Sequence, residues 1–251
     1  SHHVVTASAS RRADVQARRS RESTGHAHLR SHCYRPRAAR PVMKIVDVRT
    51  HVLSTPLDEP FAFSMGWVHR RSAVIVEVIT DDGVIGWGES LCHGLQPPQI
   101  AAAIIAHALK PIVVGQDPFD VDVLWERMYN LTRPFGQKGA VPNAISGVDI
   151  AIWDCLGRAL GKPVHKLLGG AYRTDVQPYA TGFYRRREGV YPAEAIDEAR
   201  RHMDSGFTAM KLKIGFGVEQ DIAYVQAVRE AIGPGPRIMV DANHAYNVGA
   251  A

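Results

Sequence analysis

The chain has 251 residues, enough for one large domain or two smaller ones, and its 45% hydrophobic and 22% charged residues are ordinary for a globular protein. Its net charge of +5 comes from residues 1–42, which hold nine arginines, no lysine and two acids, so that the remainder carries −2. The positive charge therefore does not imply a nucleic-acid-binding body, and no apolar run approaches the ~20 residues that cross a membrane.

The cysteines are few and scattered. Cys33, Cys92 and Cys155 show no CxxC spacing and no even framework. This pattern favours free thiols in a reducing compartment, and we expect a cytoplasmic protein.

Residues 1–42 are rich in Arg, Ser, Ala and His and have almost no aliphatic periodicity, so they cannot bury enough apolar surface to fold. Three interpretations remain open. Translation starts at Met43, which directly precedes a clean strand pattern; or the segment is a disordered tail; or it is an organellar transit peptide, which is also rich in Arg and Ser and poor in acids.

From Met43 to about residue 172 the pattern predicts an α+β domain. Period-two alternation and a turn signal at 81–83 indicate an antiparallel meander of three strands, and apolar spacing of three and four indicates three helices after it. The predicted strands are 44–53, 73–80 and 84–89, and the predicted helices are about 98–113, 120–131 and 141–160.

From residue 173 to 251 the rhythm changes to alternating strands and helices with short loops, which is typical of parallel βα units and of the start of a (β/α) barrel. The predicted strands are 176–181, 209–214 and 237–241, and the predicted helices are 192–205 and 218–232. Three such units neither close a barrel nor form a satisfied open sheet. We therefore expect the chain to be a fragment of a longer protein.

The pair Lys211 and Lys213 is the strongest candidate for chemistry. Residues at i and i+2 of a strand share a face about 6.6–6.8 Å apart, and lysine is seldom buried without a reason. Like charges and partial burial both disfavour the ammonium form, so a lysine here is expected to be brought towards neutrality and to act as a base. The alternative is an exposed pair on an edge strand.

Asp241 ends the following predicted strand, at the edge where (β/α) barrels carry their sites. Its carboxylate suits Mg²⁺, which binds one or two carboxylates, several waters and the substrate; a helix N-cap is an equally simple role. Asn243 is suited to donate to a substrate oxygen or to form a turn. His244, Tyr246, Tyr179 and Thr181 are placed near the same edge, with a core role for Tyr179 as the alternative.

Gly66-Trp67 and His69-Arg70-Arg71 fall in the predicted loop between the first two strands. A basic, aromatic loop is suited to recognise an acid, although an ordinary exposed loop has the same composition. Gly215-Phe216-Gly217 lacks the third glycine of a dinucleotide fingerprint and is interpreted as a turn before a helix.

Taken in order, these motifs resemble the mandelate racemase/muconate lactonising enzyme family of the enolase superfamily. The resemblance covers Met43 to the end of the chain. It is carried by Gly86-Trp87-Gly88-Glu89, Gly147-Val148-Asp149-Ile150-Ala151-Ile152-Trp153-Asp154, Lys166-Leu167-Leu168-Gly169-Gly170, the Lys211/Lys213 pair and Asp241-Ala242-Asn243.

The resemblance implies a capping domain followed by a (β/α)₇β barrel that is truncated here after about three strands. It implies that Lys213 is the general base, that Lys211 tunes it, that Asp241 is the first Mg²⁺ ligand and that Asn243 contacts a small carboxylate substrate. Tyr179 and Trp67 are the further substrate-binding candidates, and segments 63–71 and 91–96 shape specificity. Asp149 and Asp154 are implied to be structural.

The closest likeness is to members that act on sugar acids and their lactones by cycloisomerisation, dehydration or racemisation. The resemblance also implies a homo-oligomer when full length, with neither a nucleic acid nor a membrane as partner. The family's two further acidic metal ligands come from later barrel strands that this chain lacks. Because one carboxylate cannot hold Mg²⁺ tightly, the resemblance implies that this N-terminal fragment is catalytically inactive and poorly folded by itself. Two other hypotheses stay open: a non-catalytic truncated or degenerate family member, and a nucleic-acid-binding protein that works through the Arg-rich tail.

Overall fold

The computed structural model describes residues 42–92 and 94–251. The predictions for the Arg-rich segment and Cys33 lie outside the described residues, apart from Val42. Among the helices of the described part, none is long and apolar enough to cross a membrane.

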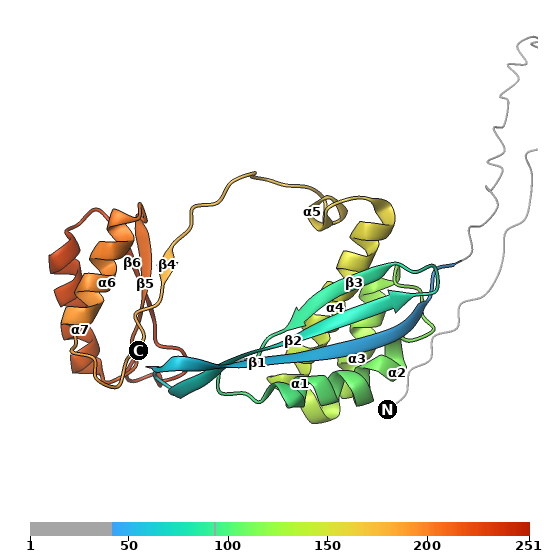
Figure 1. Cartoon of the computed structure of the whole chain (residues 1–251), viewed down its shortest axis with the longest axis horizontal. Helices are drawn as coiled ribbons and strands as arrows, with labels where there is room; N and C mark the ends of the chain where they lie inside the picture. The colour runs from blue at the N-terminus through green and yellow to red at the C-terminus, as the bar shows by residue number, and fades with distance from the viewer. Residues whose placement is uncertain (1–41, 93) are drawn as a thin grey trace, which may run out of the picture. The chain divides into compact units, whose positions relative to one another are not determined.

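The first sheet is an antiparallel meander in the order β1-β2-β3, as predicted (Figure 1). Its strands are β1 (Ile45–Phe63), β2 (Gly66–Thr80) and β3 (Ile85–Ser90). The side chains that point to the core alternate along β2, where Val74, Val76 and Val78 are fully buried.

The first two strands are much longer than predicted, and the predicted loop at residues 63–71 is wrong. β1 and β2 form a hairpin whose turn is at residues 64–65, so Trp67, His69, Arg70 and Arg71 belong to β2. The register of β1 shifts between Pro56 and Phe61. This irregularity accommodates two prolines, which cannot donate to a regular ladder and which hid the strand in the sequence pattern.

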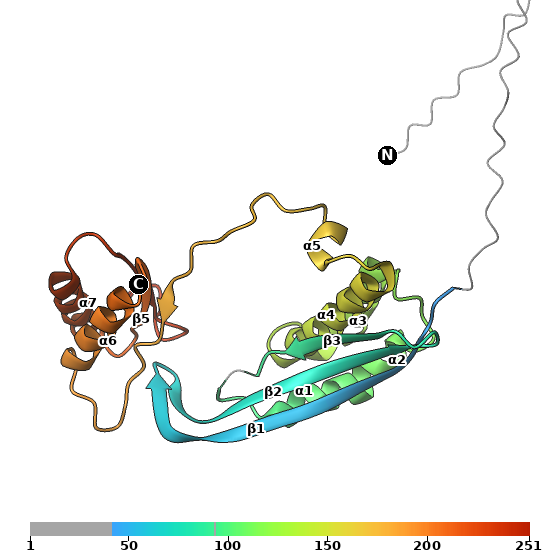
Figure 2. The ribbon, with the colours of Figure 1, turned by 45° about the horizontal axis from the view of Figure 1, so that its top comes forward.

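Helices cover one face of this sheet (Figure 2). The predicted helix at 98–113 is divided by a π-helical turn just before Pro111, which has no N–H to continue the hydrogen-bond ladder. The helical elements are α1 (Pro98–Ile104), η1 (Ile105–Leu109), α2 (Lys110–Val113), α3 (Val121–Gly136), α4 (Ala140–Leu160) and a short α5 (Val164–Leu167) that the pattern did not predict.

Helix α4 packs directly on the backbone of β3, and this contact explains the two glycines of the Gly86-Trp87-Gly88 motif. A Cβ at Gly88 would lie 2.2 Å from the carbonyl oxygen of Gly147, and one at Gly86 would lie 2.1 Å from that of Ala151. The carboxylate of Asp154 accepts a hydrogen bond from the backbone N–H of Trp87 (2.9 Å), which is a structural contact between the same two elements.

The second sheet is parallel, in the order β4-β5-β6, and its strands alternate with helices as predicted. Its elements are β4 (Ala180–Thr181), α6 (Ala193–Asp204), β5 (Ala209–Lys213), α7 (Val218–Ile232) and β6 (Arg237–Asp241). The predicted strand at 176–181 is wrong except for its last two residues, because Pro178 has no N–H to give to the ladder.

Each sheet has its own hydrophobic cluster. One is built from β1, β2 and helices α1 to α4, and the other joins β5 to α6 and α7 through Met210, Leu212, Ala199 and Val228. The boundary drawn from the sequence between residues 172 and 173 falls between these clusters and stays a prediction.

Candidate active site

The carboxyl ends of β5 and β6 bring the predicted base and the predicted metal ligand together. The two strands pair in parallel, with Lys211 opposite Met239 and Lys213 opposite Asp241. Lys213 Nζ lies 2.7 Å from Asp241 Oδ2, and Lys211 Nζ lies 3.4 Å from the same oxygen. The side chain of Lys213 is 8% exposed and that of Lys211 is 26% exposed, so the edge-strand alternative is wrong for Lys213.

Asn243 completes this arrangement. Its backbone N–H donates to Asp241 Oδ1 (2.9 Å), and its side-chain Oδ1 accepts from Lys213 Nζ (3.1 Å). Its φ of 54° lies in the left-handed region, which asparagine tolerates better than most residues. Asn243 therefore both forms the turn after β6 and contacts the candidate base Lys213.

The electrostatics of the pair differ from the expectation for Lys211. The hydrogen bond from Lys213 is the main cause that lowers the pKa of Asp241 to about 2. Burial acts to lower the pKa of Lys211, but the hydrogen bond and charge of Asp241 outweigh burial, and the pKa of Lys211 is raised. The prediction that the two ammonium groups drive each other towards neutrality neglected the carboxylate between them.

Two tyrosines face the lysines. Lys211 Nζ lies 5.5 Å from the ring centroid of Tyr179, which is 44% exposed, so a core role for Tyr179 is wrong. Lys213 Nζ lies 5.6 Å from the ring centroid of Tyr184, in the segment after β4. Sequence reasoning missed Tyr184 because it placed the strand end at Thr181 and looked no further along the chain.

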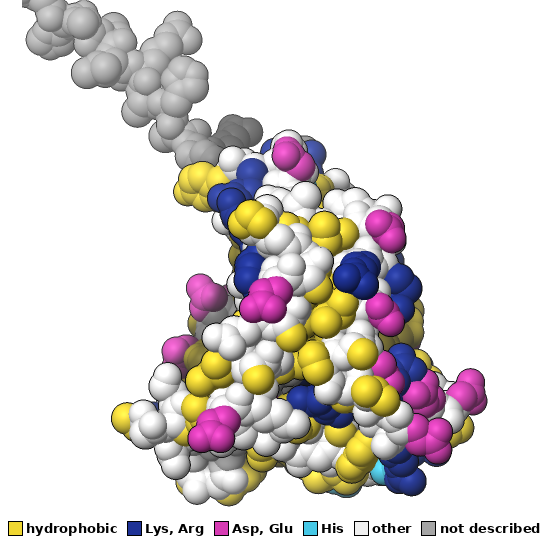
Figure 3. Space-filling model, turned by 90° about the vertical axis from the view of Figure 1, so that its left-hand side faces the viewer, with side chains coloured by type: hydrophobic (Ala, Val, Ile, Leu, Met, Phe, Trp, Pro, Cys, Tyr) yellow, Lys and Arg dark blue, Asp and Glu magenta, His cyan; other side chains and the backbone are white. Residues whose placement is uncertain are grey.

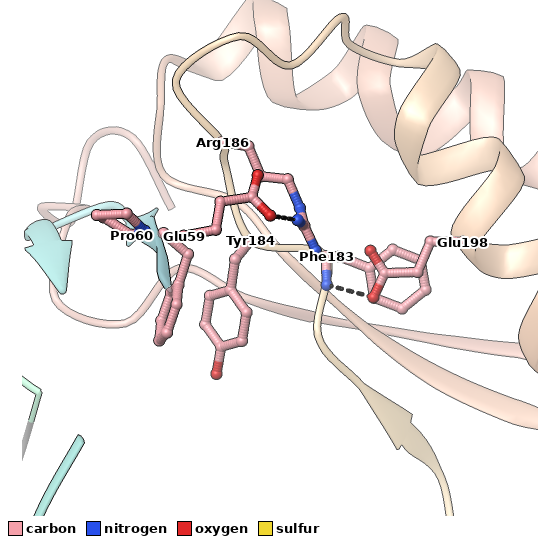
Figure 4. A pocket seen from close by; sticks show the side chains of 7 residues that line it. Glu59, Pro60, Phe183, Tyr184, Arg186 and Glu198 are labelled. Atoms are coloured by element: carbon pink, nitrogen blue, oxygen red, sulfur yellow. Dashed lines mark hydrogen bonds and ion pairs between the residues drawn. The ribbon is translucent and has the colours of Figure 1, made fainter. Parts of the chain in front are cut away.

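Tyr184 also lines a small pocket of about 120 Å³ between the end of β1 and the segment after β4. Figure 4 shows the ion pair of Arg186 with Glu59 at one side of it and the hydrogen bond from the backbone N–H of Phe183 to Glu198 (3.0 Å) at the other. The charged side chains labelled there, Glu59, Arg186 and Glu198, all have partners, and Tyr184 is the residue that this pocket shares with the lysine site.

Trp67 lies in a different cavity of about 400 Å³, formed by β2 and the segment after β3. Its ring is 5.4 Å from the guanidinium carbon of Arg187, and the cavity is also lined by His69, Arg70 and Gln96. These residues give the cavity a basic and amide-rich wall.

His244 is exposed and has no role that the geometry singles out. Tyr246, in contrast, donates its hydroxyl proton to Asp221 of α7. Asp221 was not a sequence candidate, because an acid in the first turn of a helix is ordinary there.

The donor set fits a divalent cation only in part. Asp241 supplies an ionised carboxylate of the kind that Mg²⁺ prefers. Within residues 42–92 and 94–251, however, no three His, Cys, Asp or Glu side chains are grouped so as to hold a metal ion. Asp241 therefore stays a candidate ligand, and a complete site would require further donors.

The surface on one side of the molecule is mixed in charge. Figure 3 shows Lys and Arg side chains interspersed there with Asp and Glu and with hydrophobic groups. This distribution differs from the basic stripe by which nucleic-acid-binding domains are recognised.

Comparisons with known proteins agree with the geometry. Residues 45–169 match the family described as mandelate racemase / muconate lactonizing enzyme, N-terminal domain, and residues 194–251 match the family described as enolase C-terminal domain-like.

Two curated relatives are named as enzymes of sugar acids or their lactones. The chain is 44% identical over 206 residues to D-galactarolactone cycloisomerase of Agrobacterium fabrum, and the matched region covers 82% of the chain and 53% of that protein. It is 36% identical over 208 residues to arabinonate dehydratase of Saccharolobus solfataricus, and the matched region covers 80% of the chain and 54% of that protein.

Among solved structures, the 3,6-anhydro-D-galactonate cycloisomerase from Zobellia galactanivorans superposes with a TM-score of 0.67 at 36% identity, over 81% of this chain and 52% of that one. The chain thus spans about half the length of the curated relatives it matches.

Proposed function

Because the chain belongs to the mandelate racemase/muconate lactonizing enzyme family of the enolase superfamily, we propose that the protein abstracts the proton α to the carboxylate of a sugar acid or its lactone. The outcome is cycloisomerisation, dehydration or racemisation. The observation that carries this proposal is the position of Lys213 Nζ, 2.7 Å from Asp241 and 3.1 Å from Asn243.

In this proposal Lys213 is the general base. Its amine is nearly enclosed, and a neutral amine there removes the α-proton from a substrate carbon. In the structure, Lys213 Nζ donates hydrogen bonds to Asp241 Oδ2 and Asn243 Oδ1. Lys211, whose pKa is raised, contributes a lasting positive charge beside the site.

The oxygen-rich side of the site receives the substrate carboxylate. Asp241 would hold a divalent cation, which enolase-superfamily members typically use and which, when bound, supplies positive charge for the enediolate. We propose Mg²⁺ as that cation. Asn243 offers its amide to a substrate oxygen, and Tyr179 presents its ring beside Lys211 as a wall of the binding site.

We assign Trp67 to substrate recognition from the capping domain, because its cavity has polar and basic walls suited to hydroxyl and carboxylate groups. The names of the relatives from Agrobacterium fabrum and Saccharolobus solfataricus support a sugar-acid substrate. A homo-oligomeric full-length protein and a cytoplasmic location stay predictions.

The test is a screen for proton exchange. The full-length protein with Mg²⁺ is incubated in deuterated buffer with a panel of aldonic and aldaric acids and their lactones, and loss of the α-proton signal is followed by NMR. We expect exchange with at least one acid, and none after chelation of the metal with EDTA. Full-rate exchange in EDTA, or no exchange with any acid, contradicts the proposal.

A non-catalytic truncated or degenerate family member is the second candidate. The described residues supply a single carboxylate to the site and no group of three metal-binding side chains. This candidate predicts that the organism makes no longer form of the protein. It also predicts that the purified 251-residue chain folds but neither binds Mg²⁺ nor catalyses exchange of the α-proton of a sugar acid.

A further inference from the structure

Asp221 is a buried carboxylate for which the proposed chemistry has no use. It lies in the first turn of α7 and is 3% exposed. A carboxylate removed from water is unfavourable unless hydrogen bonds replace its hydration. Asp221 Oδ2 has three donors: the backbone N–H of Gly215 (2.7 Å), the backbone N–H of Phe216 (3.1 Å) and the hydroxyl of Tyr246 (2.5 Å).

These donors come from two different segments of the site. Gly215 and Phe216 follow β5, which ends with the candidate base Lys213. Tyr246 belongs to the segment after β6; that strand ends with Asp241, and the segment also carries Asn243. One carboxylate oxygen therefore ties the segment of the base to the segment of the metal ligand.

The two segments are also in direct contact at Gly215. Its φ is +101°, and a Cβ there would lie 2.7 Å from Ala245 Cβ and 3.0 Å from the carbonyl oxygen of Ala242. No side chain fits between them. A displacement of the backbone at 215–216 therefore shifts Ala242, the residue next to Asp241.

The contact extends to the segment after β4 through Phe216. The guanidinium carbon of Arg185 lies 4.6 Å from the centroid of the Phe216 ring, and the backbone of Arg185 pairs with that of Ala62 in an isolated antiparallel bridge. Asp221 thus holds, directly or through Phe216, the segments that follow all three strands of the second sheet.

We propose that Asp221 is a positioning residue, which fixes the segments after β5 and β6 so that Lys213 Nζ is kept between Asp241 and Asn243. This inference rests on the proposed role of Lys213 as the base. Hydrogen bonds to an ionised acceptor are stronger and shorter than neutral ones, so a carboxylate holds two flexible segments more firmly than an amide does.

Three variants of the full-length protein separate this role from a general effect on α7. Asp221→Asn removes the charge with little change of shape. Tyr246→Phe removes only the donor from the second segment. Glu219→Gln is the matched control, because Glu219 is an exposed acid in the same helical turn.

The first readout is α-proton exchange, resolved into kcat and KM. We expect Asp221→Asn to lower kcat by about 10- to 100-fold with little change of KM, because misplacement of the base affects the transition state more than substrate binding. Tyr246→Phe has a smaller effect in the same direction, and Glu219→Gln has wild-type values.

The second readout does not depend on activity. Native protein is treated briefly with acetic anhydride, and acetylation of Lys213 is measured by mass spectrometry relative to the exposed Lys138 and Lys162. We expect labelling of Lys213 to rise several-fold in Asp221→Asn, together with faster hydrogen exchange at the amides of Gly215 and Phe216, while Glu219→Gln matches the wild type.

Wild-type kcat and wild-type Lys213 labelling in Asp221→Asn overturn the inference. If Asp221→Asn does not fold, the same two readouts on Tyr246→Phe decide it. If the wild-type protein exchanges no α-proton, the proposed function fails, and labelling of Lys213 with amide exchange then decides separately whether Asp221 holds the two segments.

Discussion

Substitution of Gly88 by alanine tests how closely α4 packs on β3. A Cβ at Gly88 would meet the carbonyl oxygen of Gly147 at 2.2 Å and the backbone nitrogen of Ala151 at 2.7 Å, against about 3.4 Å for an ordinary contact. The helix would have to retreat by about 1 Å, and α4 has ten buried residues, seven of which belong to the first hydrophobic cluster.

Overpacking of a core costs about 1–3 kcal/mol. Since backbone atoms of a 21-residue helix form the obstacle, we expect a loss at the upper end, about 3 kcal/mol, in the free energy of unfolding. For a domain of this size that loss lowers Tm by roughly 6–12 °C. The assay is urea and thermal unfolding followed by circular dichroism.

Gly235→Ala is the matched control, because nothing lies within 4 Å of a Cβ there and its φ is not in the left-handed region. It is expected to change stability by less than about 0.5 kcal/mol, or to stabilise slightly by restricting the unfolded chain. A Gly88→Ala protein as stable as Gly235→Ala would refute the packing argument.

Four further outcomes follow from the side chains of Asp241, Cys155 and Leu212. The folded-state pKa of Asp241 is about 2, below its ordinary 3.8, so its ion pairs stabilise the fold above pH 3.8. This stabilisation is lost as the pH falls through about 2. In Asp241→Asn, the stability should no longer show this dependence on acid pH. Burial raises the pKa of Cys155 to about 11 from an ordinary 9.0, so iodoacetamide at pH 8 should leave Cys155 unmodified in native protein and label it after unfolding, with mass spectrometry as the readout. Its stabilising contribution is present below pH 9.0 and is lost as pH rises through about 11, so stability should decline over that range. Leu212→Ala should cost about 2–5 kcal/mol in urea unfolding because Leu212 is fully buried, whereas Leu131→Ala, at a position that is 62% exposed, should cost less than 1 kcal/mol.

The elements with strong periodicity were predictable from the sequence. Helix α7 and strand β6 have the predicted bounds, because each has a clear apolar pattern between glycine turns. The meeting of Lys213 with Asp241 was also predictable, since parallel neighbouring strands bring their carboxyl ends to one edge. The contact between Lys213 and Asp241, which are 28 positions apart, followed from the parallel pairing of the two strands alone.

Other features depend on pairing that no local pattern records. The outer half of β1 contains Pro56, Pro60 and the two acids Asp58 and Glu59, and it is a strand only because β2 supplies its partner. The strand expected at 176–181 is reduced to its last two residues, because Pro178 has no N–H to give to the ladder with β5.

In the site, the missed residues are those whose partners lie on other segments. Asp221 has the sequence signature of an ordinary acid at a helix start, and its role depends on backbone groups of the preceding turn and on Tyr246. The raised pKa of Lys211 was missed because it depends on Asp241, whose carboxylate lies between the two lysines and outweighs the effect of burial.

The most direct test of the account is the rate at which solvent deuterium enters the α-carbon of a sugar acid, compared between wild-type full-length protein and its Lys213→Ala and Lys166→Ala variants. Lys166 is an exposed lysine of α5 and serves as the control. The account predicts that Lys213→Ala lowers the rate by about 10²- to 10⁴-fold, the usual contribution of a general base, and that Lys166→Ala has the wild-type rate. Deuterium uptake at the wild-type rate in Lys213→Ala would contradict it.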